Sequence, residues 1–591
     1  MNWTASEAVP AKRVFDWLDY AVFGGMLLVS ALIGVYFAFC ARRRPNTTSE
    51  YLMGGKVMGV FPISMSLIAS YISGITLLGM PSEMYMYGTQ YWVAVIPEVL
   101  VSVTMALVYL PVFYTLQITS SYEYLKLRFN HTVRLLGSIL FLIKMMVYIP
   151  VVIYVPALAF SQVTGINLHL ITPIVCVVCI FYTTLGGLKA VVWTDTLQTV
   201  VMFGGVLTVM VLGTVDVGGV SAVLQRSREG DRLEFFNLDL DPRTRHTFWN
   251  VCIGNYFSWL ASCSVNQAMV QRCLAMPSVR KANVTIMILA VGIVCIVSMS
   301  CYTGLVIYAT FADCDPITTK VIRKPDQLLP YYVMEIAEFI PALPGLFVAG
   351  VFSAALSTMS TGLNSMTGVI FEDLIRPACR TPISEARASL VMKAVVVVIG
   401  CACVGLVFLV DQMGTILQAA KSLTGITSGA LLGMFSLGMF FPWANPLGAL
   451  SGGVCGVALV GWISLGTQAA IASRRITFPT KPLSVQGCPH ALNSTAPPPA
   501  AADPADAFFL FRMSYLWYNL IGTLTVLVVG LAVSFLTGPV DPRDVSRDLL
   551  TPVIHRFLPE EASRRHKQNG AELQRLSTGA GGDPPGDGRP T

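Results

Sequence analysis

The chain has 591 residues, of which 54% are hydrophobic and only 12% are charged. Soluble globular proteins carry about twice that charged fraction, so the composition excludes a soluble protein and indicates a polytopic membrane protein. The net charge of +6 is modest. No basic segment alternates with aromatic residues, so a nucleic-acid partner is not expected.

Thirteen apolar segments follow one another along the chain, and each is close to or longer than the ~20 residues that cross a bilayer as a helix. We therefore expect an all-α polytopic membrane protein with thirteen transmembrane helices. The predicted spans cover residues 17–40, 58–80, 90–116, 133–163, 167–187, 193–216, 247–270, 284–311, 341–372, 388–410, 413–440, 446–470 and 515–537.

Basic residues gather after the odd-numbered spans, which sets the expected orientation. After the first, third, fifth, seventh and ninth spans stand Arg42, Arg43, Arg44, Lys126, Arg128, Arg134, Lys189, Arg272, Arg280, Lys281, Arg376, Arg380 and Arg387. Because cytoplasmic loops are enriched in Lys and Arg, these sides are predicted to be cytoplasmic. The N-terminus is then outside the cell and the C-terminus inside.

The predicted outer loops contain two features that agree with this orientation. Asn493 begins an Asn-Ser-Thr sequon within the loop 471–512, where it can be glycosylated. Cys314 and Cys488 lie in two outer loops and could form a disulfide or remain free thiols. The segment 538–591 is rich in Gly, Pro and Arg, and we expect a disordered cytoplasmic tail there.

The ninth span contains the polar stretch SAALSTMSTGLNS at residues 353–365. On a helix, positions i, i+3, i+4 and i+7 share one face, and Ala354, Ser357, Thr358 and Thr361 have that spacing. The hydroxyls could bond carbonyls of their own helix, or the small residues could allow close helix packing. Alternatively, the hydroxyls and nearby carbonyls bind Na⁺, a hard cation that takes several neutral oxygens. The clustering favours the sodium site.

A sodium site needs a second wall, and the second span is the candidate. It reads SLIASYISGITLLGMPSEMYMYG over residues 66–88, and the seventh span reads NVCIGNYFSWLASCSVNQAMVQR over 250–272. Gly-interrupted apolar segments in corresponding positions of two halves indicate unwound helices whose free carbonyls coordinate ions. Spans two to six and seven to eleven are therefore expected to form two inverted five-helix repeats.

This organisation divides the chain into successive segments. The expected parts are an extracellular N-terminus (1–16), a first helix with its cytoplasmic loop (17–57), the first repeat (58–216), an extracellular loop (217–246), the second repeat (247–440), two accessory helices with their outer loop (441–537) and the cytoplasmic tail (538–591).

Longer motifs resemble those of the sodium/solute symporter family, whose core is the LeuT-type 5+5 inverted repeat. They include ASYISGITLLGMPSEMYMYG, TLGGLKAVVWTDTLQ, VNQAMVQR, LPGLFVAGVFSAALST and FEDLIRP. The resemblance covers about residues 15–540 and is closest to the branch of monocarboxylate, multivitamin and iodide transporters. GTQYW and GMFFPWANPLGA look most like multivitamin members. DCDP looks more like monocarboxylate and iodide members, and Cys314 and Cys488 also match cysteines of the monocarboxylate member.

The resemblance implies a set of sodium ligands. Carbonyls that bind sodium in the family fall on Ala69 and Ile72 in the second span, and on Ala354 in the ninth. The hydroxyls of Ser357 and Thr358 complete this set, in agreement with the helix face described above.

Members that bind a second sodium use an Asp and two further hydroxyls, which match Asp195, Ser360 and Thr361. All three are present, so two sodium ions per cycle are expected. Asp195 could instead lie at the cytoplasmic mouth and merely pair with a Lys.

The solute cavity of the family lies between the two interrupted spans. By resemblance it is lined by Tyr71, Thr76, Trp259 and Ser262, where hydroxyls and helix N-termini could hold a carboxylate. Trp259 could alternatively be a packing residue.

Three departures from the branch alter this cavity. Cys263 and Ser264 replace an aromatic residue and a Gly, and Glu98, Lys144 and Lys421 are charged residues inside spans that the branch fills with uncharged ones. Buried charges are costly and face cavities or each other. Glu98 could pair with Lys144 or Lys421, or a Lys could face the cavity and bind an anionic solute. A free Glu98 there would disfavour anions or take up a proton.

The expected function is sodium-coupled import of a small organic anion across the plasma membrane, with sodium as coupling ion and no other cofactor. The anion is a monocarboxylate or a carboxylate vitamin such as biotin or pantothenate; the alternatives are iodide, or a sodium-gated sensor or channel on the same fold. The sequence contains neither HExxH nor GxxxxGK, so no enzyme or nucleotide-driven pump is expected.

Overall fold

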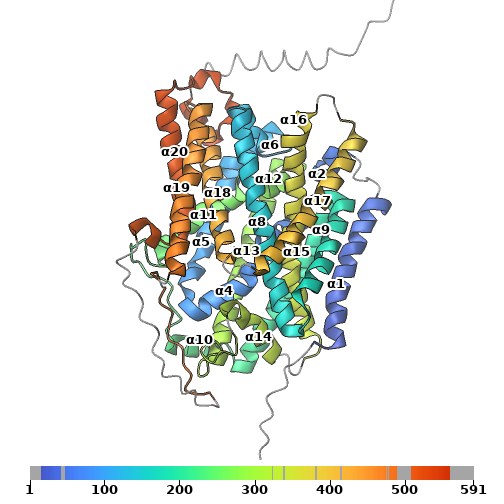
Figure 1. The fold of residues 1–591 in the computed structure, drawn as a ribbon, viewed down its shortest axis with the longest axis vertical. Helices are drawn as coiled ribbons and strands as arrows, with labels where there is room; N and C mark the ends of the chain where they lie inside the picture. The colour runs from blue at the N-terminus through green and yellow to red at the C-terminus, as the bar shows by residue number, and fades with distance from the viewer. Residues whose placement is uncertain are drawn as a thin grey trace, which may run out of the picture.

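The computed structural model describes residues 15–41, 47–322, 324–336, 340–379, 383–412, 416–473, 475–476, 478–488 and 508–558. This part of the chain is a bundle of helices and contains no β-strand. The long helices run between the two ends of the bundle, with α10 (Val220–Glu229) and α14 (Leu328–Ile336) at one end and α6 (Leu110–Leu116) and α16 (Arg376–Ala378) at the other (Figure 1).

The helices of the first half include the elements expected for spans one to six. They are α1 (Trp17–Val35), α2 (Thr48–Met53), α3 (Val60–Tyr71), α4 (Gly74–Tyr87), α5 (Val95–Thr104), α7 (Glu123–Arg128), α8 (His131–Thr164) and α9 (Leu168–Val217). The second half contributes α11 (Asn255–Cys263), α12 (Gln267–Leu274), α13 (Val279–Phe311), α15 (Leu343–Val369), α17 (Glu385–Gln412), α18 (Ile416–Phe440), α19 (Pro446–Ala472) and α20 (Tyr518–Leu536).

Nine helices among the described residues are long and apolar enough to cross a membrane, and a bent pair that ends in α3 would make a tenth. The sequence predicts more spans because it counts interrupted helices. The second and seventh predicted spans are broken in the structure, the fifth and sixth share α9, and the apolar part of α18 is only Thr424–Phe440. The count of thirteen therefore stays a prediction.

Helix α9 cannot be one straight span. Its 50 residues would extend about 75 Å at 1.5 Å per residue, more than twice the ~30 Å hydrocarbon core. Its backbone leaves the helical region at Gly187, where φ is 55° and ψ is −150°. A side chain there would also meet the carbonyl oxygen of Tyr51, 2.7 Å from the added Cβ. Gly187 thus divides α9 where the sequence predicts a boundary between two spans.

The second predicted span is broken between α3 and α4. The helical hydrogen bonds end at Ile72, whose N–H donates to the carbonyl of Ile68, and resume at Ser73, whose carbonyl accepts from Thr76 and Leu77. Ile72 is extended, with φ −94° and ψ 98°, and the Ser73 hydroxyl accepts from the Thr76 N–H at 3.3 Å and caps α4.

The seventh predicted span is broken in a corresponding way. Helix α11 ends at Cys263, and α12 begins at Gln267. Between them, Asn266 is extended and its side chain accepts from the N–H of Ala268 at 3.0 Å. An Asn at this position favours a new helix start because its side chain satisfies an N–H that has no helical partner. Both predicted interruptions are therefore present.

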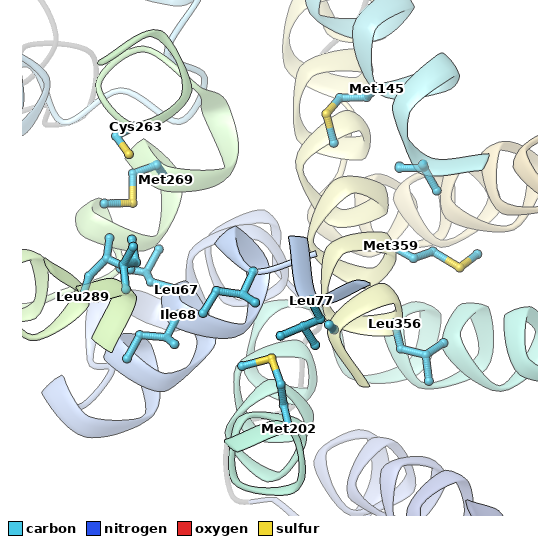
Figure 2. Close-up of a cluster of buried hydrophobic side chains, with 14 of the residues drawn as sticks. Leu67, Ile68, Leu77, Met145, Met202, Cys263, Met269, Leu289, Leu356 and Met359 are labelled. Atoms are coloured by element: carbon cyan, nitrogen blue, oxygen red, sulfur yellow. The ribbon is translucent and has the colours of Figure 1, made fainter. Parts of the chain in front are cut away.

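The interrupted helices lie within the packed centre of the bundle. Figure 2 shows Leu67, Ile68 and Leu77, from both sides of the α3–α4 break, between Leu289 of α13 on one side and Leu356 of α15 on the other. Helix α15 is buried along nearly its whole length and packs against α9, α8, α1 and α3. A helix without an exposed face forms the core of a membrane bundle, so its polar residues face protein rather than lipid.

Two of the basic residues used to predict the orientation are not loop charges. Arg128 is buried and donates to the carbonyls of Gly438, Phe441 and Pro442, each at 3.0 Å. Arg134 is buried and forms an ion pair with Asp373. Both satisfy buried oxygens at one end of the bundle instead of standing free in a loop, and the predicted orientation stays a prediction.

The opposite end of the bundle contains the predicted cysteine pair. Cys314 and Cys488 form a disulfide, with their Cα atoms 4.9 Å apart, and the N–H of Gly487 donates to the carbonyl of Asp313 at 2.9 Å. The segment around Cys488 is therefore joined to the loop after α13. The predicted glycosylation site, Asn493, lies outside the described residues.

The first part of the predicted tail is ordered, which corrects the sequence-based expectation of disorder from residue 538. Leu550 and Thr551 are buried, and Thr551 donates its N–H to Met439 and its hydroxyl to Val108. The average composition of residues 538–591 is dominated by the Gly- and Pro-rich end, which lies outside the described residues. That average does not reveal the few apolar residues near its start that pack against the bundle.

Candidate ion and solute site

The polar face of α15 lies against the end of α3, beside the break. The hydroxyl of Ser70 is 3.1 Å from that of Ser357 and 2.9 Å from that of Thr361. Ser357 and Thr361 are buried. The face predicted from helical spacing is therefore turned toward the interrupted helix, as a two-walled ion site requires.

The five residues predicted to bind the first sodium lie on these two elements and are all buried. Ala69 and Ile72 stand at the end of α3, where the helical hydrogen bonds stop, and Ala354, Ser357 and Thr358 lie on α15. The Thr358 hydroxyl donates to the Ala354 carbonyl at 2.9 Å. This is the bond expected of a simple membrane hydroxyl, yet the hydroxyl oxygen keeps lone pairs that can accept a cation.

Asp195 is fully buried on α9 and lies beside the same cluster. Its carboxylate accepts from the Ser66 hydroxyl at 2.6 Å and from the Ser360 hydroxyl at 3.5 Å. Of the three residues predicted for a second sodium, Ser360 contacts Asp195 directly and Thr361 does not. The Asp195 side chain therefore faces the bundle interior and is not exposed at a cytoplasmic mouth.

Arg272 of α12 joins the two halves of this cluster. Its guanidinium is 3.0 Å from the Asp195 carboxylate and donates to Ser70 at 2.9 Å and also to Thr361. Only 1% of Arg272 is exposed. Its expected place in a cytoplasmic loop is therefore wrong, and its positive charge neutralises Asp195 inside the bundle.

Three members of the cluster were missed by sequence reasoning: Ser66, Ser70 and Arg272. Ser66 and Ser70 share one face of α3, four residues apart, and that spacing was available as a signal. No sequence signal placed Arg272 in the cluster, because a single Arg near the end of an apolar segment looks the same whether it is buried or lies in a loop.

The predicted solute residues lie at the end of α3, at the start of α4 and on α11. Tyr71 stacks on Trp259 of α11, with ring centroids 5.6 Å apart, and donates its hydroxyl to the Ser262 carbonyl at 2.5 Å. The Thr76 hydroxyl is 3.3 Å from that of Ser73, at the start of α4. Trp259 therefore contacts the first interrupted helix and does not lie alone in the lipid.

Glu98, Lys144 and Lys421 are the charged residues that stand where the monocarboxylate, multivitamin and iodide branch has uncharged ones. Glu98 on α5 is 5% exposed and Lys144 on α8 is 7% exposed. No ion pair joins them within the described residues, so the structure does not show the pairing that the sequence left open. Lys421 belongs to α18, but its side chain lies outside the described residues.

An ionic cluster covers the far end of α4. Glu83 pairs with Arg245 at 2.8 Å and lies 3.4 Å from Nε2 of His246, which is buried. Burial lowers the pKa of His246 to about 4 and outweighs the nearby Glu83, which acts to raise it. The imidazole is therefore neutral at pH 7.

Comparison with known proteins agrees with this geometry. The family model of the sodium:solute symporter family matches residues 51–456. Sodium-coupled monocarboxylate transporter 2 of Mus musculus is 40% identical over 544 residues, which cover 92% of this chain and 87% of that protein. The sodium-dependent multivitamin transporter of Oryctolagus cuniculus is 39% identical over 556 residues, which cover 92% and 86% respectively.

Among solved structures, a substrate-bound, outward-open Na⁺-coupled sialic acid symporter has a TM-score of 0.72 to this chain. It is 23% identical, and the match covers 89% of this chain and 100% of that one. This likeness establishes the shared fold.

Proposed function

Because this chain belongs to the sodium:solute symporter family, we propose that it is a secondary active symporter that couples sodium entry to the import of a small organic anion. The observation that supports this most is the contact of the α15 hydroxyls with the α3–α4 break, where Ser357 lies 3.1 Å from Ser70. The family consists of transporters, so the site serves binding and release, not bond chemistry.

The first sodium is proposed to bind between the carbonyls of Ala69, Ile72 and Ala354 and the hydroxyls of Ser357 and Thr358. All five residues are uncharged, so the bound ion is held by dipoles alone. Such a site can release its ion when α3 and α15 move apart, because no buried carboxylate is then left without a partner.

A second sodium is proposed at Asp195, Ser360 and Thr361. The ion pair between Asp195 and Arg272 limits this site, because a sodium ion and the guanidinium would share one carboxylate. We therefore propose that the second ion enters only when Arg272 turns away from Asp195.

The proposed topology has thirteen helices, with the N-terminus outside, the C-terminus inside and Asn493 glycosylated in an outer loop. Within it, two inverted five-helix repeats are proposed to move against each other during the transport cycle. Sodium and solute favour the same closed state, which couples their binding. Each positive charge that enters across 100 mV contributes about 2.3 kcal/mol to solute accumulation. We propose that the protein acts in the plasma membrane, because the sodium gradient there is directed inward.

The solute is proposed to bind beside the Tyr71–Trp259 pair, with Thr76, Ser262, Glu98 and Lys421 around it. The monocarboxylate and multivitamin names of the relatives support a small carboxylate. Iodide, and a sensor or channel that does not accumulate solute, are the alternatives that an uptake experiment separates.

The sodium site is tested by Ser357→Ala and Thr358→Ala in the full chain. Each should raise the sodium concentration for half-maximal uptake about tenfold or more, because one ligand of the ion is lost; tenfold corresponds to about 1.4 kcal/mol. The measurement is uptake of radiolabelled butyrate against external sodium, in protein counted at the cell surface.

Thr367→Ala is the matched control. Thr367 is also a buried α15 residue, and its hydroxyl bonds the carbonyl of Leu363 within the helix. It should leave sodium dependence unchanged. Unaltered sodium dependence in both Ser357→Ala and Thr358→Ala would contradict the assignment.

A further inference from the structure

A segment that follows α20 lies across one end of the bundle and bonds to elements from distant parts of the chain. Its residues Val545, Leu550 and Thr551 are buried. The Thr551 N–H donates to the Met439 carbonyl near the end of α18 at 3.1 Å, and the Thr551 hydroxyl donates to the Val108 carbonyl at 3.0 Å. The segment is therefore packed onto the bundle by contacts of its own.

Helix α7 supports one side of this segment. The Tyr124 hydroxyl donates to the Leu549 carbonyl at 3.1 Å. The guanidinium of Arg128, on the same helix, bonds to carbonyls at the end of α18. Helix α7 and the end of α18 are thus joined to each other, and the segment rests on both. The bond from the Thr551 hydroxyl to Val108 reaches a different element.

That element, η4 (Met105–Tyr109), is a natural bending point. It is a π-helical turn between α5 and α6, and Pro111 at the start of α6 supplies no N–H to the helix. Sharp changes of helix direction occur at π turns and prolines, and π turns are frequent at functional sites. The hydroxyl bond from Thr551 therefore holds the span at the place where it can bend.

Bending at η4 would shift the part of the span that lies beside the proposed solute site. Helix α5 packs against α11, and the Thr104 hydroxyl at the end of α5 lies 2.8 Å from the Tyr256 hydroxyl. Helix α11 also contains Trp259, which stacks on Tyr71. A change of angle at η4 would therefore move α5 relative to a helix of the proposed solute site.

Thr551 also connects the two halves of the molecule. Val108 lies in the first proposed repeat and Met439 in the second. We infer that residues 545–551 form an autoinhibitory clamp, which slows transport by holding η4 against the end of α18. This inference rests on the proposed function, because the clamp acts on the motion of the two repeats. An interaction that is present at rest and lost when the repeats move raises the barrier to that motion.

Thr551→Val tests the clamp in the purified full chain, reconstituted in proteoliposomes with an inward sodium gradient. The substitution keeps the shape of the side chain and the N–H bond to Met439, but removes the hydroxyl bond to Val108. The maximal rate of sodium-dependent uptake of radiolabelled butyrate should rise about threefold or more, as expected when one hydrogen bond is lost from the resting state. The sodium concentration for half-maximal uptake should not change. A purely structural role would lower the rate instead.

A second variant and a matched control accompany this measurement. Tyr124→Phe keeps the ring that stacks on Phe435 and removes the bond to Leu549, so it should also raise the rate. Thr525→Val removes a hydroxyl of α20 that bonds the Ile521 carbonyl of the same helix at 2.7 Å. It should leave the rate unchanged.

Thiol labelling follows the clamp itself. Thr551→Cys and Val553→Cys are labelled with N-ethylmaleimide, which crosses the membrane, and the labelled peptides are quantified by mass spectrometry. Because Thr551 is buried and Val553 is exposed, the thiol introduced at position 551 should react more slowly at rest. It should react faster when sodium and butyrate are supplied, since the clamp then opens in each cycle.

The outcomes separate the clamp from the proposed function. An unchanged or lower rate in both Thr551→Val and Tyr124→Phe, while the unaltered protein transports butyrate, would overturn the clamp and leave the symporter intact. Labelling at position 551 that does not respond to transport would do the same. Absence of sodium-dependent uptake in the unaltered protein and in both variants would contradict both proposals.

Discussion

Arg272 and Asp195 illustrate what a single pair of residues contributes to this protein. Both are almost completely buried, and their charged groups are 3.0 Å apart. A buried ion pair adds little net stability compared with apolar residues, but removing one partner leaves an uncompensated charge, at a cost of about 3–5 kcal/mol. The pair is therefore expected to be required for folding as well as for ion access.

Asp195→Asn and Arg272→Gln should each lower the thermal unfolding temperature of the purified protein, because each leaves one buried charge alone. The double variant should recover much of the loss, since neither charge remains. Thermal unfolding followed by fluorescence-detected size exclusion measures this. Additive losses in the double variant would show that the two residues do not act as a pair.

His246 should make stability depend on pH. Burial lowers its pKa from 6.5 to about 4, so below pH 6.5 the unfolded chain binds a proton that the folded protein does not. The contribution of His246 to stability is complete above pH 6.5, falls as the pH decreases toward 4, and stays lost below that. His246→Gln should reduce the loss of unfolding temperature between pH 7 and pH 4, and equal pH dependence in the two proteins would refute the assignment.

Sequence periodicity predicted the residues of the α15 face but not their full surroundings. The positions of Ser357 and Thr361 follow from helical spacing, and Ser70 proved to face them. The guanidinium of Arg272 could not be placed in this way. Its position depends on how α12 packs after the break, which is a tertiary contact between distant parts of the chain.

At the scale of elements, the interruptions were the most predictable feature. Polar and Gly residues in apolar segments predicted that the second and seventh spans are interrupted, because these residues stabilise helix ends. The exact positions of the breaks, at Ile72–Ser73 and before Gln267, come from the structure. The division of α9 was predicted only as a boundary between spans. The ordered segment after α20 was missed, because its few buried anchors, such as Leu550, lie within a polar region.

Gly187 provides a test of the divided helix. Gly187→Ala should lower the unfolding temperature and surface expression, because φ is 55° and an added Cβ would lie 2.7 Å from the Tyr51 carbonyl. Gly204, also on α9, has open space around its Cβ position. Gly204→Ala should therefore be neutral or stabilising. Equal stability of the two variants would contradict a required break at Gly187.

At the scale of the molecule, helix packing joins the proposed ion and solute sites through one broken segment. Ser70, near the end of α3, contacts α15, while Tyr71, the next residue, contacts α11. Sodium binding between α3 and α15 would fix the end of α3 and thereby the wall of the proposed solute site. This adjacency gives a physical route for coupling between the two ligands.

The most direct test of sodium-coupled symport is accumulation in proteoliposomes of the purified protein. Internal butyrate is measured over time, with an inward sodium gradient or with choline in place of sodium. The account predicts that butyrate rises above its external concentration only with the sodium gradient, and that the excess disappears when the gradient is collapsed. Uptake that stops at the external concentration, or that is equal in choline, would contradict sodium-coupled symport.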